Sequence, residues 1–332
     1  MSEIKKDGNY RVCRRCIMDS TVSGIQFDDD GICDCCKKYQ DRISRELHYD
    51  AAGKEKLKYL VENIKKEGRN KKYDCIVGLS GGLDSSFLVY KARELGLRML
   101  AVHVDNGWDT ELSRENIEKL CNKLDIDLHV YKVDWQEFRD LQLSFLKASV
   151  INAEMPTDHL YLAYQYRFAA EKGFKYILSG GNIVTEAGQP DAWKFDFKDW
   201  KHIKTIHDKF GQVKLKKFPR LTLSMWIYYI FVKGIKCLSL LNYIPYVRKD
   251  AIKLLEREIG YKYYGQKHCE SVFTRFFQNY FLVERFGYDK RKPHLSSLIL
   301  SGQITREEAL EELSKPLYDP KQLEEDKLYM RK

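Results

Sequence analysis

One stretch decides the fold of this chain: Ser80-Gly81-Gly82-Leu83-Asp84-Ser85-Ser86. The apolar run 73–79 before it predicts a buried strand, and residues 87–95 after it predict a helix. Two glycines at such a junction let the backbone approach an oxyanion closely. The N–H groups at the helix start and the serine hydroxyls can donate to that oxyanion. The stretch therefore predicts an anion-binding turn between a strand and a helix.

The turn is not a Walker A loop, because no Gly-Lys-Ser/Thr closes it. Ser-Gly-Gly-x-Asp-Ser instead resembles the pyrophosphate loop (PP-loop) of the N-type ATP pyrophosphatases. The resemblance implies an enzyme that splits ATP into AMP and pyrophosphate and joins the AMP to an oxygen of its substrate. An ordinary glycine-rich turn is the alternative, but it would carry only one or two of these features, whereas this motif sits in the strand–helix context that its chemistry requires.

Beyond the loop, predicted strands and helices alternate. The strands are expected at 98–105, 127–133, 176–178 and 238–246, and the helices at 113–124, 135–150, 158–172 and 249–259. Ser113 is the expected cap of its helix. This alternation predicts an α/β fold with a doubly wound, parallel, five-stranded sheet covered on both faces. The loops after the strands should meet at one edge, where ligands bind.

Nine cysteines are present, and the polar first 15 residues predict no export signal. We therefore expect thiols and metal ligation rather than disulfides. Four cysteines follow the spacing C-x2-C-x16-C-x2-C, namely Cys13, Cys16, Cys33 and Cys36. This spacing predicts a structural Zn²⁺ in a ribbon or knuckle. A register that uses Cys35, an iron–sulfur site and free thiols are the alternatives.

We expect four parts along the chain. They are a zinc ribbon at 1–48, a connecting helix at 49–71, a PP-loop domain at 72–260 with an insertion at about 191–235, and a mainly helical C-terminal substrate region at 261–332. A capping box at Thr305 and Glu308 predicts a helix start near the end of the chain.

The composition fits a cytoplasmic globular protein, with 44% apolar and 32% charged residues. A net charge of +9 suggests an anionic partner: a nucleotide, a sugar nucleotide, a nucleic acid or an acidic membrane face. Residues 221–243 are the most apolar, but Lys233 and Lys236 interrupt them, so no transmembrane segment is expected. A buried helix is the prediction for this segment, and a membrane-surface patch is the alternative.

The predicted ATP site combines the loop with other strand ends. The residues expected to bind ATP and its Mg²⁺ are Ser80, Gly81, Gly82, Leu83, Asp84, Ser85, Ser86, Asp105, Gly180, Gly181 and Asn182. Asp105 ends the second strand, where adenosine would lie, although an Asp there can also cap a turn. His103 lies on the same face of that strand and is interpreted as a core histidine or, alternatively, a catalytic one.

The C-terminal region carries motifs rich in Lys, His, Arg and Glu. They are Tyr264-Gly265-x-Lys267-His268-x-Glu270-Ser271, Thr274-Arg275-Phe276-Phe277-Gln278, Asp289-Lys290-Arg291-x-x-His294 and Ser301-Gly302-x-Ile304-Thr305-Arg306. With the cysteine pairs, the loop and Val102-His103-Val104-Asp105-Asn106-Gly107-Trp108, they make the chain resemble the N-acetyl sugar amidotransferases. These are PP-loop enzymes of the adenine nucleotide alpha hydrolase-like fold.

The resemblance implies an enzyme that converts an acetamido group of a UDP-linked N-acetyl sugar to an acetamidino group in O-antigen, capsule or flagellar glycan synthesis. It implies catalytic roles for Asp84, Lys267, His268 and Arg275, and substrate contacts from Glu270, Ser271, Lys290, Arg291 and His294. ATP, Mg²⁺ and structural Zn²⁺ would be the cofactors. A glutaminase subunit, with or without a cyclase-like companion, would supply ammonia. No nucleic-acid partner is expected, and a homo-oligomer is compatible with the sequence.

Two other functions compete with this interpretation. A tRNA-thiolating PP-loop enzyme would share the zinc module, the basic charge and the adenylation step. The remaining cysteines, however, stand singly rather than in further Cys-x-x-Cys pairs: Cys75, Cys121, Cys237 and Cys269. The second competitor is a non-enzymatic zinc-ribbon adaptor that keeps a nucleotide fold.

Overall fold

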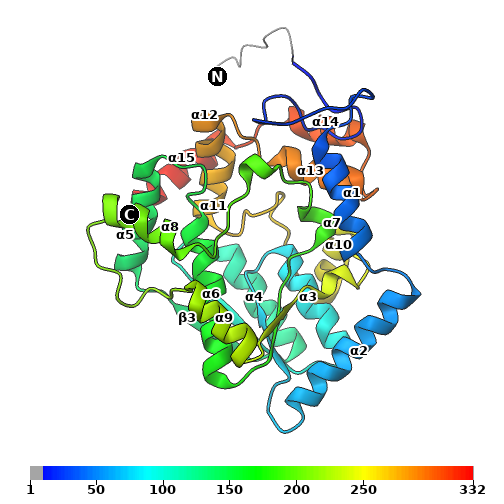
Figure 1. The fold of residues 1–332 in the computed structure, drawn as a ribbon, viewed down its shortest axis with the longest axis vertical. Coiled ribbons are helices and arrows are strands. Elements are labelled where there is room, and N and C mark those ends of the chain that lie inside the picture. The colour runs from blue at the N-terminus through cyan, green and yellow to red at the C-terminus, as the bar shows by residue number, and fades with distance from the viewer. Residues whose placement is uncertain (1–9, 332) are drawn as a thin grey trace.

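A computed structural model describes residues 10–331 of the protein, so most of the polar start on which the export prediction depends lies outside the described residues. Its centre is a five-stranded parallel sheet in the order β3-β2-β1-β4-β5 (Figure 1). The strands are β1 (Cys75–Gly78), β2 (Met99–Asp105), β3 (Leu128–Lys132), β4 (Tyr176–Leu178) and β5 (Lys236–Leu238). The predicted α/β fold with five parallel strands is confirmed.

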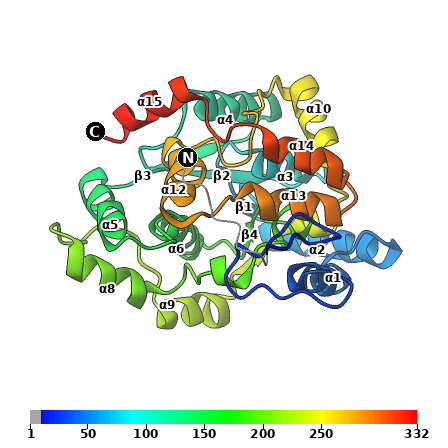
Figure 2. The ribbon, with the colours of Figure 1, turned by 90° about the horizontal axis from the view of Figure 1, so that it is seen from above.

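Helices cover both faces of the sheet, as Figure 2 shows from above. One face carries α2 (Ala51–Gly68), α3 (Leu83–Glu94), α4 (Glu111–Leu124) and α10 (Arg248–Ile259). The other carries α5 (Trp135–Ala148), α6 (Met155–Lys172), α8 (Trp200–Phe210) and α11 (Val272–Phe276). Each face of the sheet packs on an apolar core, and alternate residues of a strand belong to the two cores. Val77 packs toward α3, whereas its neighbour Ile76 packs toward α6.

The strand order creates a switch point between β1 and β4. From β1 the chain continues to β2 on one side, whereas β4 and β5 lie on the other side. The loops that leave β1 and β4 therefore diverge and open a crevice at the carboxyl edge of the sheet. The predicted anion-binding turn, residues 80–86, is called the anion loop below. This loop and the two glycines after β4, Gly180 and Gly181, lie at this crevice.

Two predicted boundaries are corrected by the structure. Helix α4 begins at Glu111 and is capped by Thr110, whose side chain accepts a hydrogen bond from the Ser113 N–H, so Ser113 is not the cap. The fifth strand covers Lys236–Leu238 rather than 238–246, because a 3-10 turn follows at Leu240–Asn242. The capping box of Thr305 and Glu308 is confirmed at the start of α14 (Arg306–Ser314).

The prediction of a buried helix at 221–243 is wrong. The segment forms α9 (Leu223–Ile227), a π-helical turn (Tyr228–Val232) and the edge strand β5. Its two ends are buried through Leu221, Leu240 and Leu241. Between them only the inner side is buried, through Tyr229 and Ile235, and several large apolar side chains face outward. Among residues 10–331, no helix is long and apolar enough to cross a membrane.

The N-terminal module packs against the C-terminal region. Helix α1 (Asp34–Glu46) contacts α7 (Ile183–Glu186) and α13 (Arg291–Leu300), and these segments lie side by side in both views (Figures 1 and 2). The remaining helices, α12 (Leu282–Phe286) and α15 (Pro320–Tyr329), belong to the same mainly helical region. Because the module and the C-terminal region share small apolar cores, the domain boundaries predicted above stay predictions.

Candidate active site

A cavity of about 390 Å³ opens at the carboxyl ends of β1, β2 and β4 and is called the main cavity below. Its walls come from the anion loop, from the loop after β4, from α6 and from residues 263–270 of the C-terminal region. Its size is in the range of small-molecule sites. The crevice at the switch point is thus covered by the C-terminal region.

The anion loop has the geometry that its sequence predicts. Gly81 adopts a φ of 80°, which favours glycine, and Gly82 is the N-cap of α3 without a side-chain acceptor. The first N–H groups of α3 are therefore not satisfied by a capping side chain. The hydroxyl of Ser80 lies 3.2 Å from that of Ser85 and accepts a hydrogen bond from the Gly82 N–H. The loop can receive a phosphate at a helix N-terminus.

Gly180 brings the loop after β4 against this helix start. A Cβ on Gly180 would lie 2.9 Å from the backbone N and Cα of Ser85, so a side chain there would push the two loops apart. Both Gly180 and Gly181 line the main cavity. The predicted contribution of the β4 exit to the same site is therefore explained by close backbone packing.

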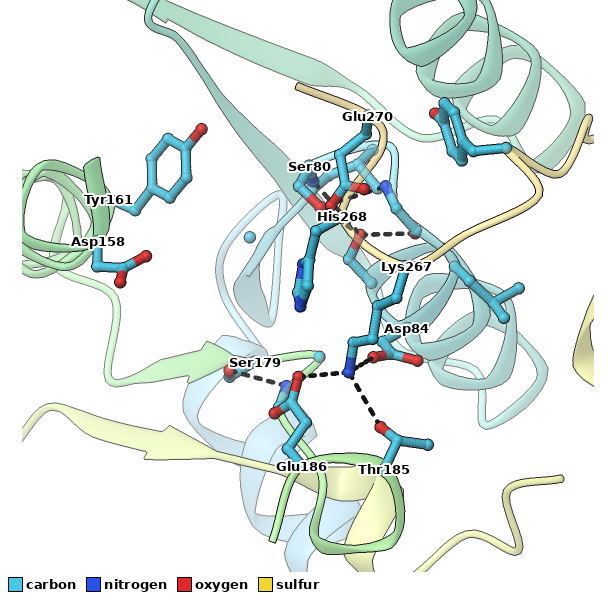
Figure 3. Close-up of a pocket in the computed structure, with 18 of the residues that line it drawn as sticks. Ser80, Asp84, Asp158, Tyr161, Ser179, Thr185, Glu186, Lys267, His268 and Glu270 are labelled. Atoms are coloured by element: carbon cyan, nitrogen blue, oxygen red, sulfur yellow. Dashed lines mark hydrogen bonds and ion pairs between the residues drawn. The ribbon is translucent and has the colours of Figure 1, made fainter. Parts of the chain in front are cut away.

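Lys267 joins the C-terminal region to the anion loop. Its ammonium lies 3.1 Å from the Asp84 carboxylate and 2.9 Å from the Glu186 carboxylate, and it donates to the Thr185 hydroxyl at 3.2 Å (Figure 3). Asp84 also accepts a short hydrogen bond from the Tyr246 hydroxyl. One lysine and two acids thus lie beside the phosphate-binding helix start.

Electrostatics keep this group charged. Burial alone would raise the pKa of Asp84, but the Lys267 charge and the Tyr246 hydroxyl lower it below the ordinary value. Burial alone would lower the pKa of Lys267, but Asp84 and Glu186 raise it instead. Lys267 and Asp84 therefore stay charged at neutral pH, and the carboxyl oxygens of Asp84 and Glu186 are the ligand type that Mg²⁺ prefers.

His268, Glu270 and His294 line the cavity next to Lys267. The Nδ1 of His268 is 3.9 Å from the Glu270 carboxylate, and its ring centre is 5.3 Å from that of His294. Burial opposes the charged form of His268, but Glu270 outweighs it and raises the pKa. The pKa of His294 is lowered well below its usual value by burial and by the nearby cations Lys267 and His268. The site therefore favours one charged and one neutral imidazole.

The opposite wall is formed by Asp158 and Tyr161 of α6, which Figure 3 shows across the cavity from Lys267. Asp158 is open to the cavity, but the protein around it desolvates the carboxyl and, together with the charge of Glu154, raises its pKa to about 7. The Tyr161 hydroxyl accepts a hydrogen bond from the Asn106 amide at 3.2 Å. Asp158 can therefore exchange a proton near neutral pH.

His103 supports the site from below. Its Nδ1 donates to the Leu79 carbonyl at 2.9 Å, and its Nε2 lies 2.9 Å from the Asp109 carboxylate. Burial would lower the pKa of His103, but Asp109 and the Leu79 carbonyl raise it. The loop that holds Asp109 hydrogen-bonds the C-terminal region, because the Thr110 N–H donates to the Glu270 carbonyl at 3.0 Å. His103 thus ties β1 to the segment that covers the cavity.

Several predicted ATP ligands do not line the main cavity. Asp105 accepts from the Gly107 N–H at 3.0 Å, so it caps a turn, which was the alternative interpretation. Asn182 caps α7 by accepting from the Thr185 N–H. Ser86 is fully buried in α3, and the carbonyl of Gly81 accepts from the hydroxyls of two tyrosines, Tyr261 and Tyr264. The cavity is lined by the other predicted loop residues: Ser80, Gly82, Leu83, Asp84 and Ser85.

The predicted catalytic role of Arg275 is not supported. Its guanidinium donates to the Asp326 carboxylate at 2.7 and 2.8 Å, joining α11 to α15, and it does not line the main cavity. Ser271 is the N-cap of α11. Arg291 pairs with Asp289 and donates to the carbonyls that end α14. These residues hold the C-terminal region together.

A second cavity of about 360 Å³ adjoins the first and is called the second cavity below. The two share Lys267 and His294, and the second continues toward Lys290 and Arg291. Burial lowers the pKa of Lys290. Of the predicted substrate residues, Glu270 and His294 therefore line the main cavity, and Lys290 and Arg291 line only the second.

The four predicted metal ligands come together and are called the four-cysteine cluster below. The Sγ atoms of Cys13, Cys16, Cys33 and Cys36 all lie within 4.8 Å of one another, and three of the pairs are 3.6 to 3.7 Å apart. A tetrahedral site with metal–sulfur bonds of about 2.3 Å places its sulfurs about 3.8 Å apart. Cys35 is buried beside this group but does not join it. The four-cysteine cluster therefore suits one metal ion, in the register predicted.

Sequence reasoning missed several residues of the main cavity. They are Asp158, Tyr161, Gln165, Thr185, Glu186, Arg248 and Tyr263. A usable signal existed for Thr185 and Glu186, since they directly follow the exit loop of a predicted parallel strand. Asp158 and Tyr161 are three apart on a predicted helix and share one face of it.

The comparisons with known families match two parts of the chain. Residues 270–332 match the family described as LPS biosynthesis protein WbpG-like, C-terminal domain. Residues 74–207 match the family described as queuosine biosynthesis protein QueC. A stretch similar to QueC is thus followed by one similar to the WbpG-like C-terminal domain, which supports the resemblance inferred from the sequence.

Individual relatives are distant. A tRNA(Ile)-lysidine synthase of Chlamydia pneumoniae is 29% identical over 120 residues, which cover 33% of this chain and 37% of that protein. An uncharacterized protein of Methanocaldococcus jannaschii is 24% identical over 329 residues, which cover 95% of this chain and 96% of that protein. A tRNA-5-methyluridine(54) 2-sulfurtransferase of Pyrococcus horikoshii is 25% identical over 147 residues, which cover 43% of this chain and 45% of that protein. The first and third matches thus span less than half of each relative.

Among solved structures, the U34-tRNA thiolase NcsA of Methanococcus maripaludis is similar to this chain. Its TM-score is 0.35 at 17% identity, and the alignment covers 77% of this chain and 80% of that chain.

Proposed function

We propose that the protein is an ATP-dependent amidotransferase that converts an acetamido group of a UDP-linked N-acetyl sugar to an acetamidino group. One observation carries the proposal. Glu270 and His294, in the region that matches the WbpG-like family, line the same cavity as Asp84 of the PP-loop, and Lys267, just before that region, pairs with Asp84. The residues that would hold the acceptor therefore lie beside those that would hold ATP.

In this proposal the triphosphate binds at the start of α3. Its oxygens accept from the N–H groups of that helix turn and from the hydroxyls of Ser80 and Ser85. Asp84 and Glu186 offer the carboxylate oxygens for Mg²⁺, which when bound would neutralise charge on the pyrophosphate. Lys267 lies within reach of the same phosphates and would stabilise the charge that the leaving group gains.

The proposed reaction has two steps, adenylation of the amide oxygen and its replacement by ammonia. The amide oxygen of the acceptor attacks the α-phosphorus of ATP, the bond between that phosphorus and the bridging oxygen breaks, and pyrophosphate leaves with the electron pair. Ammonia next adds to the imidate carbon, the carbon–oxygen bond breaks, and AMP leaves with the former amide oxygen. The nitrogen loses a proton as the acetamidino group forms. Adenylation is needed because an amide oxygen is otherwise a poor leaving group.

Asp158 is our candidate to receive that proton. Its pKa of about 7 leaves a useful fraction of carboxylate at neutral pH, and it faces the cavity opposite Lys267. A carboxylate there would also attract ammonium and take its proton, which the attack requires. A glutaminase partner would deliver the ammonia, with or without a cyclase-like companion.

The second cavity is our candidate for the nucleotide half of the acceptor. Arg248, Lys290 and Lys315 line it, and it joins the main cavity at Lys267 and His294. Basic side chains there would bind the diphosphate of the sugar nucleotide, and the acetamido group would then extend toward the PP-loop. The WbpG-like match points to surface-glycan synthesis, such as O-antigen, capsule or flagellar glycan.

We assign the four-cysteine cluster to structural Zn²⁺. The cluster is fully buried, and all four protein ligands leave no open position for a reaction. The Arg306 guanidinium donates to the Cys16 and Cys13 carbonyls at 3.2 and 3.3 Å, which ties the metal site to α14. The metal would therefore hold the C-terminal region in place.

The test is mass spectrometry of UDP-linked acetamido sugars incubated with the protein, MgATP and an ammonium salt. We expect AMP and a sugar nucleotide in which one oxygen is replaced by NH. Omitting ATP must abolish the product, and Asp84→Asn should reduce AMP formation while the bound metal stays. A protein that binds ATP but leaves every acetamido sugar unchanged would refute the proposal.

A tRNA-thiolating enzyme is the second candidate, because curated relatives include enzymes that act on tRNA. Within residues 10–331, no cysteine lines the main cavity. Burial raises the pKa of Cys269, the cysteine nearest in sequence to the cavity-lining residues, to about 11, so its reactive thiolate is disfavoured. AMP formation that depends on tRNA and not on a sugar nucleotide would favour this second function.

A further inference from the structure

A helical segment on the outside of the molecule presents large apolar side chains to solvent. Helix α9 and the π-helical turn after it run without a break over residues 223–232 and pack on α6, at the rim of the molecule in Figure 2. Five outward side chains define an apolar patch: Leu223, Ile227, Tyr228, Phe231 and Val232. Leu223, Phe231 and Val232 are 71%, 76% and 69% exposed.

The segment has two faces. Tyr229 is buried and stacks on Tyr166 of α6 at 6.2 Å, and Met225 and Ile230 pack into the same core. The patch residues follow the helical spacing i, i+4, i+5, i+8 and i+9, so they form one stripe on the other side. The inner face accounts for the folding of the segment, and the outer stripe has no role in the core.

The chain around the patch is strongly basic. Between residues 209 and 247 no Asp or Glu occurs, while seven basic residues do: Lys209, Lys214, Lys216, Lys217, Arg220, Lys233 and Lys236. Lys233 lies 5.6 Å from the Tyr228 ring centre, and Lys198 lies 5.0 Å from that of Trp226. The Lys233 ammonium and the aromatic rings therefore border the apolar stripe directly, whereas Lys198 also pairs with Asp196 at 3.7 Å and Lys217 pairs with Asp134 at 2.9 Å.

This combination indicates what the patch contacts. Protruding apolar side chains with a border of lysines and aromatic rings suit the interface of an anionic bilayer, where the chains enter the acyl boundary and the ammonium groups meet lipid headgroups. A symmetric contact with a second copy would place this cationic border against itself, which is unfavourable. Charge and shape together therefore favour a lipid surface over a self-contact.

We propose that residues 223–232 dock the protein on the surface of an anionic membrane. The chain lies on the bilayer through the patch and its basic border and does not cross it. This proposal concerns a face distinct from the main cavity and does not depend on the proposed reaction. It also corresponds to the membrane-surface alternative for residues 221–243.

The test is co-sedimentation of the full chain with two kinds of vesicle. One contains phosphatidylcholine alone, and in the other phosphatidylglycerol replaces about a third of the lipid. We expect binding to the anionic vesicles that weakens with salt, and a partition coefficient that falls by about tenfold or more in the double variant Leu223→Glu/Phe231→Glu. Lys233→Gln/Lys236→Gln should weaken binding to the anionic vesicles alone.

The matched control is Tyr59→Glu/Leu328→Glu, which adds the same charges at positions that are 65% and 61% exposed on α2 and α15. It should bind vesicles nearly as the unmodified chain does. Equal binding by the two glutamate variants, or no preference for anionic vesicles, would overturn the proposal. A dimer in sedimentation velocity that only Leu223→Glu/Phe231→Glu dissociates, without vesicle binding, would also overturn it in favour of a second copy.

Discussion

The ammonium of Lys267 lies 3.1 Å from the carboxylate of Asp84, although the two residues are far apart along the chain. Asp84 is in the first turn of α3, and Lys267 is in the segment that covers the crevice. Glu186 completes the group from the loop after β4. The pair therefore joins the phosphate-binding loop to the C-terminal region, and one ammonium offsets the charge of two acids.

Lys267→Met should reduce AMP formation by about 10²–10³-fold, the usual cost of losing one preorganised charged group. It should also weaken ATP binding, because Asp84 and Glu186 would repel the phosphates without their cation. Pyrophosphate release and a direct ATP-binding titration measure the two effects separately.

The control for this variant is Lys262→Met. Lys262 is nearby in sequence, but its side chain is 66% exposed and pairs only loosely with Glu115 at 3.7 Å. It should keep normal AMP formation. Equal activity in both variants would show that Lys267 only fastens the covering segment.

The sequence predicts those parts of the structure that depend on local pattern. The strand–loop–helix unit around Asp84 and the alternation after it determine the parallel sheet, and the spacing of the cysteines determines the metal ligands. Each of these follows from periodicity or from fixed spacing along the chain. The prediction failed at residues 221–243, because composition alone does not show that one helical face stays outside.

The sequence predicts the site less completely, because the role of each side chain there depends on the residues that pack against it in the fold. Arg275 has the residue type of a catalytic cation, but Asp326 of α15 engages it outside the main cavity. Asp105 ends a strand at the ligand edge, yet the turn after it uses its carboxylate. Asp158 lies on a helix without any motif, and only the packing of α6 brings it to the cavity.

Cys33→Ser should remove most of the bound metal and lower the melting temperature. Cys33 is one of the four buried thiols of the four-cysteine cluster, and a structural metal bound there would contribute several kcal/mol of folding energy, so a shift of roughly 5–10 °C is expected. Because Lys292 of α13 pairs with Asp19 at 2.5 Å, loss of the metal should also loosen α13 and speed its proteolysis. Metal analysis by mass spectrometry and a thermal melt measure both.

Cys35→Ser is the matched control, because Cys35 is buried next to Cys36 but does not belong to the four-cysteine cluster. It should retain one metal ion per chain and melt near the unmodified protein. Loss of metal in this variant instead of in Cys33→Ser would mean that the other register is used.

Arg275→Met should destabilise the fold without a direct effect on chemistry. Removing one partner of a buried ion pair leaves the other charge uncompensated, so the unfolding free energy should fall by about 3 kcal/mol. At low temperature, where the variant stays folded, ATP affinity should be unchanged. Lys204→Met, which removes the exposed partner of Asp208, should leave stability unaltered. A folded Arg275→Met protein with normal stability but no AMP formation would restore the catalytic role.

His103 should make stability depend on pH in a direction that its environment determines. Asp109 and the Leu79 carbonyl raise the pKa of His103 above its ordinary 6.5 despite burial, so the folded protein binds its proton more tightly than the unfolded chain does. The stabilisation is then complete below pH 6.5 and is lost as the pH rises through the higher folded pKa.

His103→Gln should therefore be least stable, relative to the unmodified protein, at about pH 6, and this difference should shrink toward about pH 9. Asp109→Asn should remove the same pH dependence, because it removes the main group that raises the pKa. His129→Gln is a control in which the pH dependence of stability has the opposite sign. Burial lowers the pKa of His129, so the stability that this histidine contributes is lost as the pH falls. Urea unfolding at a series of pH values measures all three. A difference for His103→Gln that grows with pH would show that this histidine is neutral in the fold.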